Sequence, residues 1–355
     1  MFAHTRLCEP RSIVRRPSLG KKVTNKLIND VLGIDHTASK RVGKYEGEHT
    51  SSGGLRTEQI EQVVGHLGLQ VHVADFLSNP AIDYEDYIYP LIESGCPTIL
   101  GIVGPEVAHV VAVLGHTLNS DRWTPEARMG YGGFPISPYI STSAWADHFI
   151  VGDDNFGMYV TIPTDTIRNV LVPKHNPNLH AAHAIGIVPV GVAVPGYFVE
   201  QASASVASTL VRVSTPGPNN RWFQVLKEQP LVCRTLLGEK TSYTTFMAGV
   251  SDERGNKLTD AEKAILDACL PERFWVTEIT VPHLYTGNKH KLGDIITRAD
   301  ATQDQFNSRE AIVFAWLPGL IMHGPALGSG SIYGSLMGHI PLLRGVSQDR
   351  PALEW

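Results

Sequence analysis

Two short apolar runs that lie close together in the chain restrict its fold more than any other feature. Residues 98–103 and 107–114 are strongly apolar, and a Pro-Glu pair at 105–106 separates them. A membrane-spanning helix needs about 20 consecutive apolar residues, so the interrupted stretch is excluded as a bilayer span. Short apolar runs of this kind are typical of buried strands. We therefore expect two neighbouring strands of a sheet.

Helical patterns precede these runs, and further strand patterns surround them. Apolar residues recur at helical spacing in three segments, which are 23–32, 55–67 and 84–92. Alternating or continuous apolar residues predict strands at 69–73, 148–151 and 157–162. Helices followed by a run of strands indicate the α+β class. We expect an antiparallel sheet made from the strands between residues 98 and 162, with helices 23–32 and 55–67 packed on one side.

The second half of the chain is expected to form its own α+β arrangement. Helices are predicted at 197–213 and 260–269, and strands at 274–281, 291–296 and 311–316. The apolar segment 185–194, which Pro189 interrupts, predicts a bent strand or a strand pair. A length of 355 residues suits about two domains. We therefore divide the chain into 1–164 and 165–355, and the second part either stands apart or extends the first sheet.

The composition argues against several classes of protein. An apolar fraction of 43% is enough for a sizeable core, which excludes wholesale disorder. The net charge of −5 argues against a generally basic protein that binds nucleic acid. The N-terminus has no apolar signal-peptide core, so neither a membrane nor secretion is expected. The four cysteines form no CxxC pair, which suits reduced thiols in the cytoplasm.

Two clusters of potential metal ligands have simpler structural interpretations. The acidic cluster comprises Glu278, Asp294, Asp300 and Asp304. The histidine cluster comprises His175, His180 and His183. The acidic spacing matches no ligand pattern and favours a solvated strand edge, while the histidines favour a polar loop. We therefore expect no metal site and no cofactor.

A thiol, an imidazole and a carboxylate occur where they can form one site. Cys8 lies near the start of the chain, His109 opens an apolar strand, and Asp153 and Asp154 close another. A thiol nucleophile needs a base within hydrogen-bond reach, and the imidazole needs an acceptor that selects its tautomer. Neighbouring antiparallel strands can bring the imidazole and the carboxylate together. Adjacent strand residues point to opposite faces, so only one of the two aspartates faces His109, and we favour Asp153.

Several segments match one known family in order. They are 53–69 (GGLRTEQIEQVVGHLGL), 91–99 (LIESGCPTI), 109–115 (HVVAVLG) and 150–157 (IVGDDNFG). The stretch from about residue 50 to 160 resembles the papain-like cysteine peptidase superfamily, in the branch of the bacteriocin-processing peptidases that cut double-glycine leaders. The string CEPRSI at 8–13 fits the family's nucleophile segment, in which the thiol opens a helix.

This resemblance implies a papain-like fold and thiol-dependent acyl transfer. In that chemistry Cys8 attacks a carbonyl, His109 is the base, and Asp153 or Asp154 orients the imidazole. Hydrolysis of a peptide or isopeptide bond in a peptide or protein substrate is the expected outcome, and transfer of the acyl group to an amine uses the same triad. Residues 1–7 lack the Gln or Asn that the family uses as an oxyanion donor. That departure favours the alternative of a non-catalytic module that binds a peptide or partner protein.

A long loop at 117–146 joins the predicted His109 strand to the strand that ends at the aspartates. It carries five aromatic residues, which are Trp123, Tyr131, Phe134, Tyr139 and Trp145. Such rings either line a cleft and hold an extended substrate or pack over the sheet edge. We expect at least two of them to line a cleft beside Cys8 or His109, and the substrate-binding candidates are Trp123, Tyr131 and Trp145.

Overall fold

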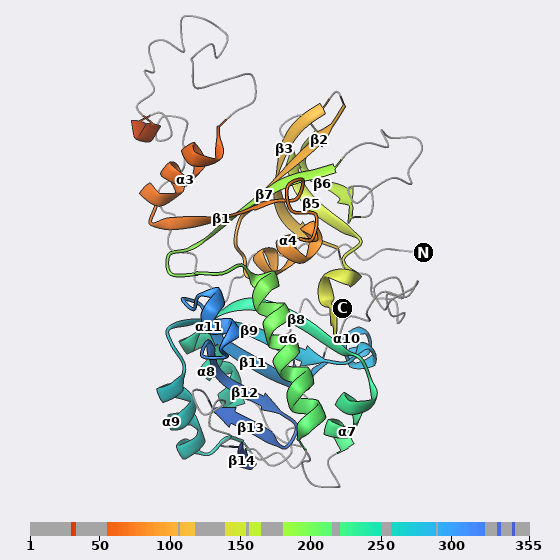
Figure 1. The fold of residues 1–355 in the computed structure, drawn as a ribbon, viewed down its shortest axis with the longest axis vertical. Coiled ribbons are helices and arrows are strands. Elements are labelled where there is room, and N and C mark those ends of the chain that lie inside the picture. The colour runs from red at the N-terminus through yellow and green to blue at the C-terminus, as the bar shows by residue number, and fades with distance from the viewer. Residues whose placement is uncertain are drawn as a thin grey trace, which may run out of the picture.

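The computed structural model describes most of the second half of the chain and, in the first half, the segments around the predicted sheet. The described ranges are 30–32, 55–105, 107–117, 139–153, 156–164, 180–214, 221–249, 257–288, 290–323, 332–334 and 343–344. They form an α+β structure with two antiparallel-rich sheets, one above the other in Figure 1. Of the helix predicted at 23–32, only residues 30–32 are described, and these are helical.

The first sheet has six antiparallel strands in the order β1-β7-β2-β3-β5-β6. They are β1 (Leu69–Asp75), β2 (Thr98–Gly104), β3 (Val107–His116), β5 (His148–Asp153), β6 (Gly157–Pro163) and β7 (His180–Pro189). The antiparallel sheet predicted between residues 98 and 162 is therefore confirmed. Its strands alternate as a half-buried sheet requires: Val111 is buried, whereas its neighbour Val110 is exposed.

Two helices accompany the first sheet. α3 (Thr57–His66) contacts the edge strand β1, and α4 (Tyr84–Glu93) covers β2, β3 and β7. Asp83 caps α4, because its side chain accepts a hydrogen bond from the backbone N–H of Glu85. Leu91 of α4 lies so close to Gly186 of β7 that a Cβ atom at Gly186 would come within 2.5 Å of the leucine Cδ1. The helix therefore packs directly on the middle of the sheet.

The second sheet has seven strands in the order β14-β13-β12-β11-β9-β8-β4. They are β4 (Tyr139–Ser141), β8 (Leu231–Glu239), β9 (Arg273–Thr280), β11 (Gly293–Arg298), β12 (Ile312–Leu317), β13 (Leu320–His323) and β14 (Ile332–Gly334). All pairs are antiparallel except β4 and β8, which are parallel. A separate pair joins β10 (His290–Lys291) to β15 (Leu343–Arg344).

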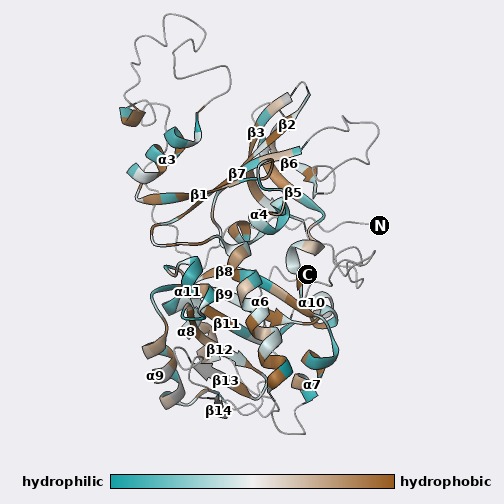
Figure 2. Cartoon of the chain, viewed as in Figure 1, coloured by the Kyte–Doolittle hydropathy of each residue, from teal (hydrophilic) through white to brown (hydrophobic). Residues whose placement is uncertain are grey.

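Helices pack against both faces of the second sheet. They are η2 (Thr142–Trp145), α6 (Gly196–Val213), α7 (Arg221–Glu228), α8 (Lys240–Gly249), α9 (Asp260–Cys269), α10 (Pro282–Asn288) and α11 (Gln303–Asn307). The buried apolar side of α6 joins one core with Cys233 and Ile279 of the sheet. Apolar residues of α8 and α9 join a separate core with Leu236 and Phe274. Along α6, hydrophobic and hydrophilic turns are both visible in Figure 2, as expected for a helix that is buried on one side.

The boundary predicted near residue 165 does not separate the two sheets. β7 follows that boundary in sequence, yet it lies between β1 and β2 in the first sheet. β4 precedes the boundary and pairs with β8 of the second sheet. β7 therefore extends the first sheet, whereas most of the strands after it form the second sheet. β7 ends at Pro189, the residue that interrupts the apolar segment, because proline has no N–H to continue a ladder.

The helices in the described ranges are too short or too polar to cross a bilayer. The longest of them, α6, has 18 residues, and it carries Glu200 and Arg212.

Candidate functional site

His109 and Asp153 meet at the end of two neighbouring strands of the first sheet. His109 lies on β3, and Asp153 is the last residue of β5. The His109 Nε2 atom is 3.0 Å from Oδ2 of Asp153. The histidine side chain keeps 24% of its surface exposed, whereas that of the aspartate keeps only 7%. The contact between the imidazole and an aspartate, which we expected from the sequence, is thus present, with the ring at the surface and the carboxylate beneath it.

Strand register explains why these two side chains share a face. β2 and β3 pair Leu100 with Val111, both buried in the core under α4. His109 lies two residues before Val111 on β3, so it points to the same side of the sheet. β3 and β5 pair Ala112 with Gly152, and the same register brings Asp153 opposite Val111. Asp153 is therefore the diagonal neighbour of His109 across the two strands.

The Asp153 carboxylate is held from two sides. Its Oδ1 atom accepts a hydrogen bond of 3.1 Å from the backbone N–H of Phe156, while Oδ2 faces His109. Gly157 follows with a φ of +105°, a conformation that favours glycine, and its position opposite Asp153 closes the turn. Asp153, one of the two candidate aspartates, contacts the histidine. Asp154 lies outside the described residues.

The arrangement can supply an oriented base. An ionised carboxylate only accepts hydrogen bonds, so the Nε2 atom of His109 carries the proton that points to Asp153. In the neutral ring Nδ1 is then the basic nitrogen. A histidine held in this tautomer can take a proton from a nucleophile and return it to a leaving group.

The described cysteines are poorly suited to be the nucleophile. Burial raises the pKa of the Cys96 thiol to about 12. Burial also raises the pKa of Cys233 well above its ordinary value and that of Cys269 in the same direction. A thiol must ionise to attack, so these environments disfavour reactivity. Cys8, the predicted nucleophile, lies outside the described residues.

Trp145 does not line a cleft, and its prediction as a substrate-binding residue is wrong. Its indole is fully buried and packs beside the ring of Tyr285, with 4.9 Å between ring centroids. Ile140 and Val232 complete this small core. The physical reason is that residues 139–141, in the predicted 117–146 loop, form β4 and pair with β8 of the second sheet. This pairing places the following helical turn η2, which contains Trp145, in the interior. Trp123 and Tyr131 lie outside the described residues.

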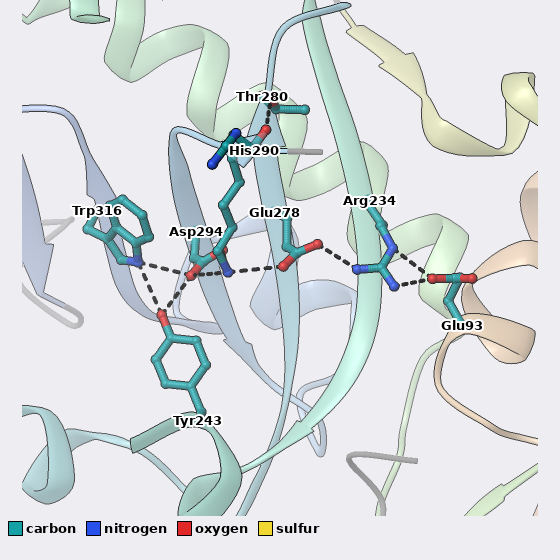
Figure 3. Close-up of polar contacts among 9 residues, drawn as sticks. Glu93, Arg234, Tyr243, Glu278, Thr280, His290, Asp294 and Trp316 are labelled. Atoms are coloured by element: carbon teal, nitrogen blue, oxygen red, sulfur yellow. Dashed lines mark hydrogen bonds and ion pairs between the residues drawn. The ribbon is translucent and has the colours of Figure 1, made fainter. Parts of the chain in front are cut away.

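A chain of buried ionic contacts forms a second cluster of polar residues, which the sequence analysis missed (Figure 3). It begins at the end of α4, where Glu93 accepts hydrogen bonds from the guanidinium of Arg234 on β8, one of them 2.7 Å long from Nε. Arg234 also donates from Nη1 to Glu278 of β9 at 2.7 Å. Arg234 therefore connects the helix of the first sheet to the central strands of the second.

The chain continues across the second sheet to β12. Lys291 donates from Nζ to Glu278 and to Asp294, each at 3.0 Å. The Tyr243 hydroxyl and the Trp316 indole N–H both donate to Asp294, at 2.8 Å and 3.1 Å. Four strands that are consecutive neighbours in the sheet, β8, β9, β11 and β12, thus contribute to one connected set of hydrogen bonds.

The prediction of a solvated strand edge is wrong for Glu278 and Asp294. Their exposed fractions are 3% and 0%, and they lie opposite each other on the adjacent strands β9 and β11. Buried carboxylates need cationic partners, which Arg234 and Lys291 supply from other strands. Asp300, by contrast, pairs with Arg298 at the surface. Among the described residues, no three His, Cys, Asp or Glu side chains are grouped closely enough to hold a metal ion.

His116 links this chain to the strand that carries His109. It lies near the other end of β3, where its Nε2 atom is 2.7 Å from the Glu93 carboxylate and its Nδ1 atom is 3.0 Å from the Thr117 carbonyl. Both partners can accept hydrogen bonds from the ring, so His116 joins the Glu93 carboxylate to the end of β3.

The partners keep one another ionised despite their burial. Burial opposes ionisation of Glu93, but Arg234 and His116 outweigh it and lower the pKa of this carboxyl. Burial likewise acts to lower the pKa of Lys291, and Asp294 and Glu278 reverse the effect, so that its pKa is raised. At Asp294 burial dominates and raises the pKa. The charges therefore depend on their partners rather than on water.

Comparison with known proteins adds nothing to this geometry. No family model, curated protein or solved structure matches the chain.

Proposed function

We propose that this protein is a thiol-dependent acyl-transfer enzyme that hydrolyses a peptide or isopeptide bond, built on a papain-like arrangement of Cys8, His109 and Asp153. The observation that carries the proposal is the 3.0 Å contact between His109 Nε2 and Asp153 at a strand end of the first sheet. That contact leaves Nδ1, the basic nitrogen, on the other side of the ring, where it can accept a proton from a thiol. The partly exposed ring also allows a substrate to reach it.

The chemistry follows from these roles. Nδ1 of His109 takes the proton of the Cys8 thiol, and the sulfur forms a bond to the carbonyl carbon of the substrate. The carbon–nitrogen bond breaks, and the imidazolium gives its proton to the leaving amine. A water molecule deprotonated by His109 then attacks the thioester carbon, the carbon–sulfur bond breaks, and the sulfur recovers a proton. Asp153 stabilises the imidazolium and does not itself take the proton.

Thiol alkylation tests the proposal without knowledge of the substrate. We expect iodoacetamide at pH 6 to modify Cys8 in the folded protein at least about tenfold faster than in the urea-unfolded chain, because a neighbouring imidazolium promotes the thiolate. His109→Ala removes that partner and reduces the rate to that of the unfolded chain. Cys269→Ser is the matched control and leaves the Cys8 rate unchanged. Mass spectrometry of the alkylated peptides measures all three rates.

Two outcomes of this experiment decide against catalysis. If Cys8 reacts no faster when folded than when unfolded, or if His109→Ala leaves its rate unchanged, the thiol and the imidazole do not form a pair. The non-catalytic peptide-binding module is then the better description. If the thiol is activated, product analysis with an added primary amine distinguishes hydrolysis from transfer to the amine.

A further inference from the structure

A bulky residue next to the candidate site has an unfavourable backbone conformation. Tyr159 has a φ of 65°, and among the described residues other than glycine only Arg309, at 67°, shares this left-handed region. A side chain with a Cβ atom is disfavoured there. Such strain persists only where the surrounding structure imposes it, and it is concentrated at functional sites.

The strain belongs to a β-bulge in the β5–β6 pair. The register matches Val151 with Val160 and Gly152 with Met158, so Tyr159 is the extra residue on β6. A residue in the left-handed region at a bulge is usually glycine. Bulges next to active sites change the direction of the side chains that follow. Here a tyrosine is kept at the position where glycine is the easier choice.

The same short segment exposes three large apolar side chains. Phe156, Met158 and Tyr159 have exposed fractions of 81%, 62% and 64%, and we call these three residues the hairpin patch. Single exposed apolar residues are common, but a contiguous group often marks a binding surface. β6 is also the last strand of its sheet in the described structure, and residues 157–163 include no charged residue. Edge strands are commonly protected by charged residues, and this one is not.

The hairpin patch is continuous with the residue that orients the histidine. The backbone N–H of Phe156 donates to Asp153, and Gly157 lies opposite Asp153 in the strand register. Met158 lies beside Gly152, on the other face of the sheet from Asp153, so a substrate bound beside His109 reaches the patch where it passes the end of the hairpin.

We propose that the hairpin patch determines substrate specificity, by binding a bulky apolar side chain of an extended peptide that passes the end of the β5–β6 hairpin. The inference rests on the proposed function, since it names the substrate of the same site. The bulge holds Tyr159 at the surface, where its ring, the Phe156 ring and the Met158 side chain lose water when an apolar side chain packs on them.

The test uses tripeptidyl vinyl sulfones, which react with a cysteine thiol and carry either leucine or serine at one of their three positions. We expect wild-type protein to prefer leucine over serine by about tenfold or more at one position, as for other apolar pockets. In Tyr159→Gly this ratio falls to about twofold or less. Because both rates are measured on the same variant, any change in thiol reactivity cancels from the ratio.

Arg309→Gly is the matched control. Glycine adopts a positive φ more readily than either native residue, so both variants are expected to raise the thermal midpoint of unfolding, by about 1–3 °C. Only Tyr159→Gly changes the leucine-to-serine ratio. If Tyr159 contributed only to stability, Tyr159→Gly would leave the leucine-to-serine ratio unchanged.

The outcomes separate this inference from the proposed function. If Cys8 is activated but the leucine preference is absent in wild type or unchanged in Tyr159→Gly, the inference is wrong and the enzyme assignment stands. If Cys8 is not activated, tripeptide amides that carry a diazirine analogue of leucine replace the reactive probes. Crosslinks to the hairpin patch that disappear in Tyr159→Gly then support apolar peptide recognition, and their absence overturns it.

Discussion

His109 and Asp153 show how much the chemistry of a site depends on the face of the strand that a side chain occupies. Asp153 shares the face of His109 and holds the proton of its Nε2 atom, while its other oxygen fastens the turn through Phe156. One residue therefore performs two tasks, orientation of the base and closure of the hairpin.

The two tasks can be separated by substitution at Asp153. Asparagine retains an oxygen that can accept from Nε2 or from Phe156, but it cannot balance an imidazolium. We expect Asp153→Asn to slow Cys8 alkylation by about tenfold or more with little loss of stability. Asp153→Ala also removes the bond to Phe156 and costs about 1 kcal/mol of unfolding free energy. Alkylation rates and urea denaturation measure the two effects, and equal loss of stability in both variants would contradict the separation.

At the scale of elements, close packing at a glycine constrains how β11 lies beside β12. A Cβ atom at Gly293 would come within 2.2 Å of the Trp316 carbonyl oxygen, which is part of the backbone and cannot rotate away. We expect Gly293→Ala to lower the free energy of unfolding by about 1–3 kcal/mol, as overpacked substitutions do. Gly65 in α3 is the control, because its added methyl meets nothing within 4 Å.

Gly65→Ala should have the opposite effect to Gly293→Ala. Gly65 lies in the last turn of α3, and alanine is more favourable than glycine in a helix by up to about 0.5–1 kcal/mol. Urea denaturation of the two variants should therefore shift in opposite directions from the wild type. A shift in the same direction would show that β11 can move away from β12 at little cost.

Arg234 is the cation that joins Glu93 of α4 to the second sheet. Arg234 is shared by Glu93 and Glu278, so Arg234→Met leaves two buried carboxylates without this partner. We expect a loss of about 3–5 kcal/mol of unfolding free energy, the usual effect of breaking a buried pair. Arg298→Met removes a solvent-exposed pair with Asp300 and is expected to cost about 0–1 kcal/mol. Chemical denaturation compares the two, and similar losses would contradict the role assigned to the buried chain.

At the scale of the whole molecule, the buried charges predict how stability depends on pH. The pKa of Glu93 is lowered from its ordinary value of 4.5, so below pH 4.5 the unfolded chain binds a proton at this residue that the folded protein does not. The stabilisation is complete above that pH and is lost as the pH falls. The unfolding free energy therefore declines by about 1.4 kcal/mol per pH unit from this group.

Glu93→Gln removes this contribution. We expect the variant to be less stable than wild type at pH 6, and the difference to shrink between pH 4.5 and pH 3. Comparison with wild type at each pH cancels contributions of groups that both proteins share, such as Asp294. Urea denaturation across this range measures the difference, and a gap that stays constant would show that Glu93 is not held ionised in the folded protein.

The sequence by itself determined the class of the fold and the local geometry of the candidate site. Short apolar runs and alternating apolar residues identified β2, β3, β5 and β6, and helical spacing located α9 at its observed bounds. The contact of His109 with an aspartate was predictable for the same reason. It needs only two neighbouring strands and the rule that alternate residues share a face, which are properties of short segments.

Only the tertiary structure decided which distant segments became neighbours. The insertion of β7 between β1 and β2, and the departure of β4 to the second sheet, depend on contacts that periodicity does not encode. Trp145 and Glu278 were misjudged for this reason, since burial depends on what covers a residue. Arg234 lies 141 residues beyond Glu93 in the chain. The sequence does not reveal which charged residues pair in the interior, because the pairing exists only once the fold brings them together.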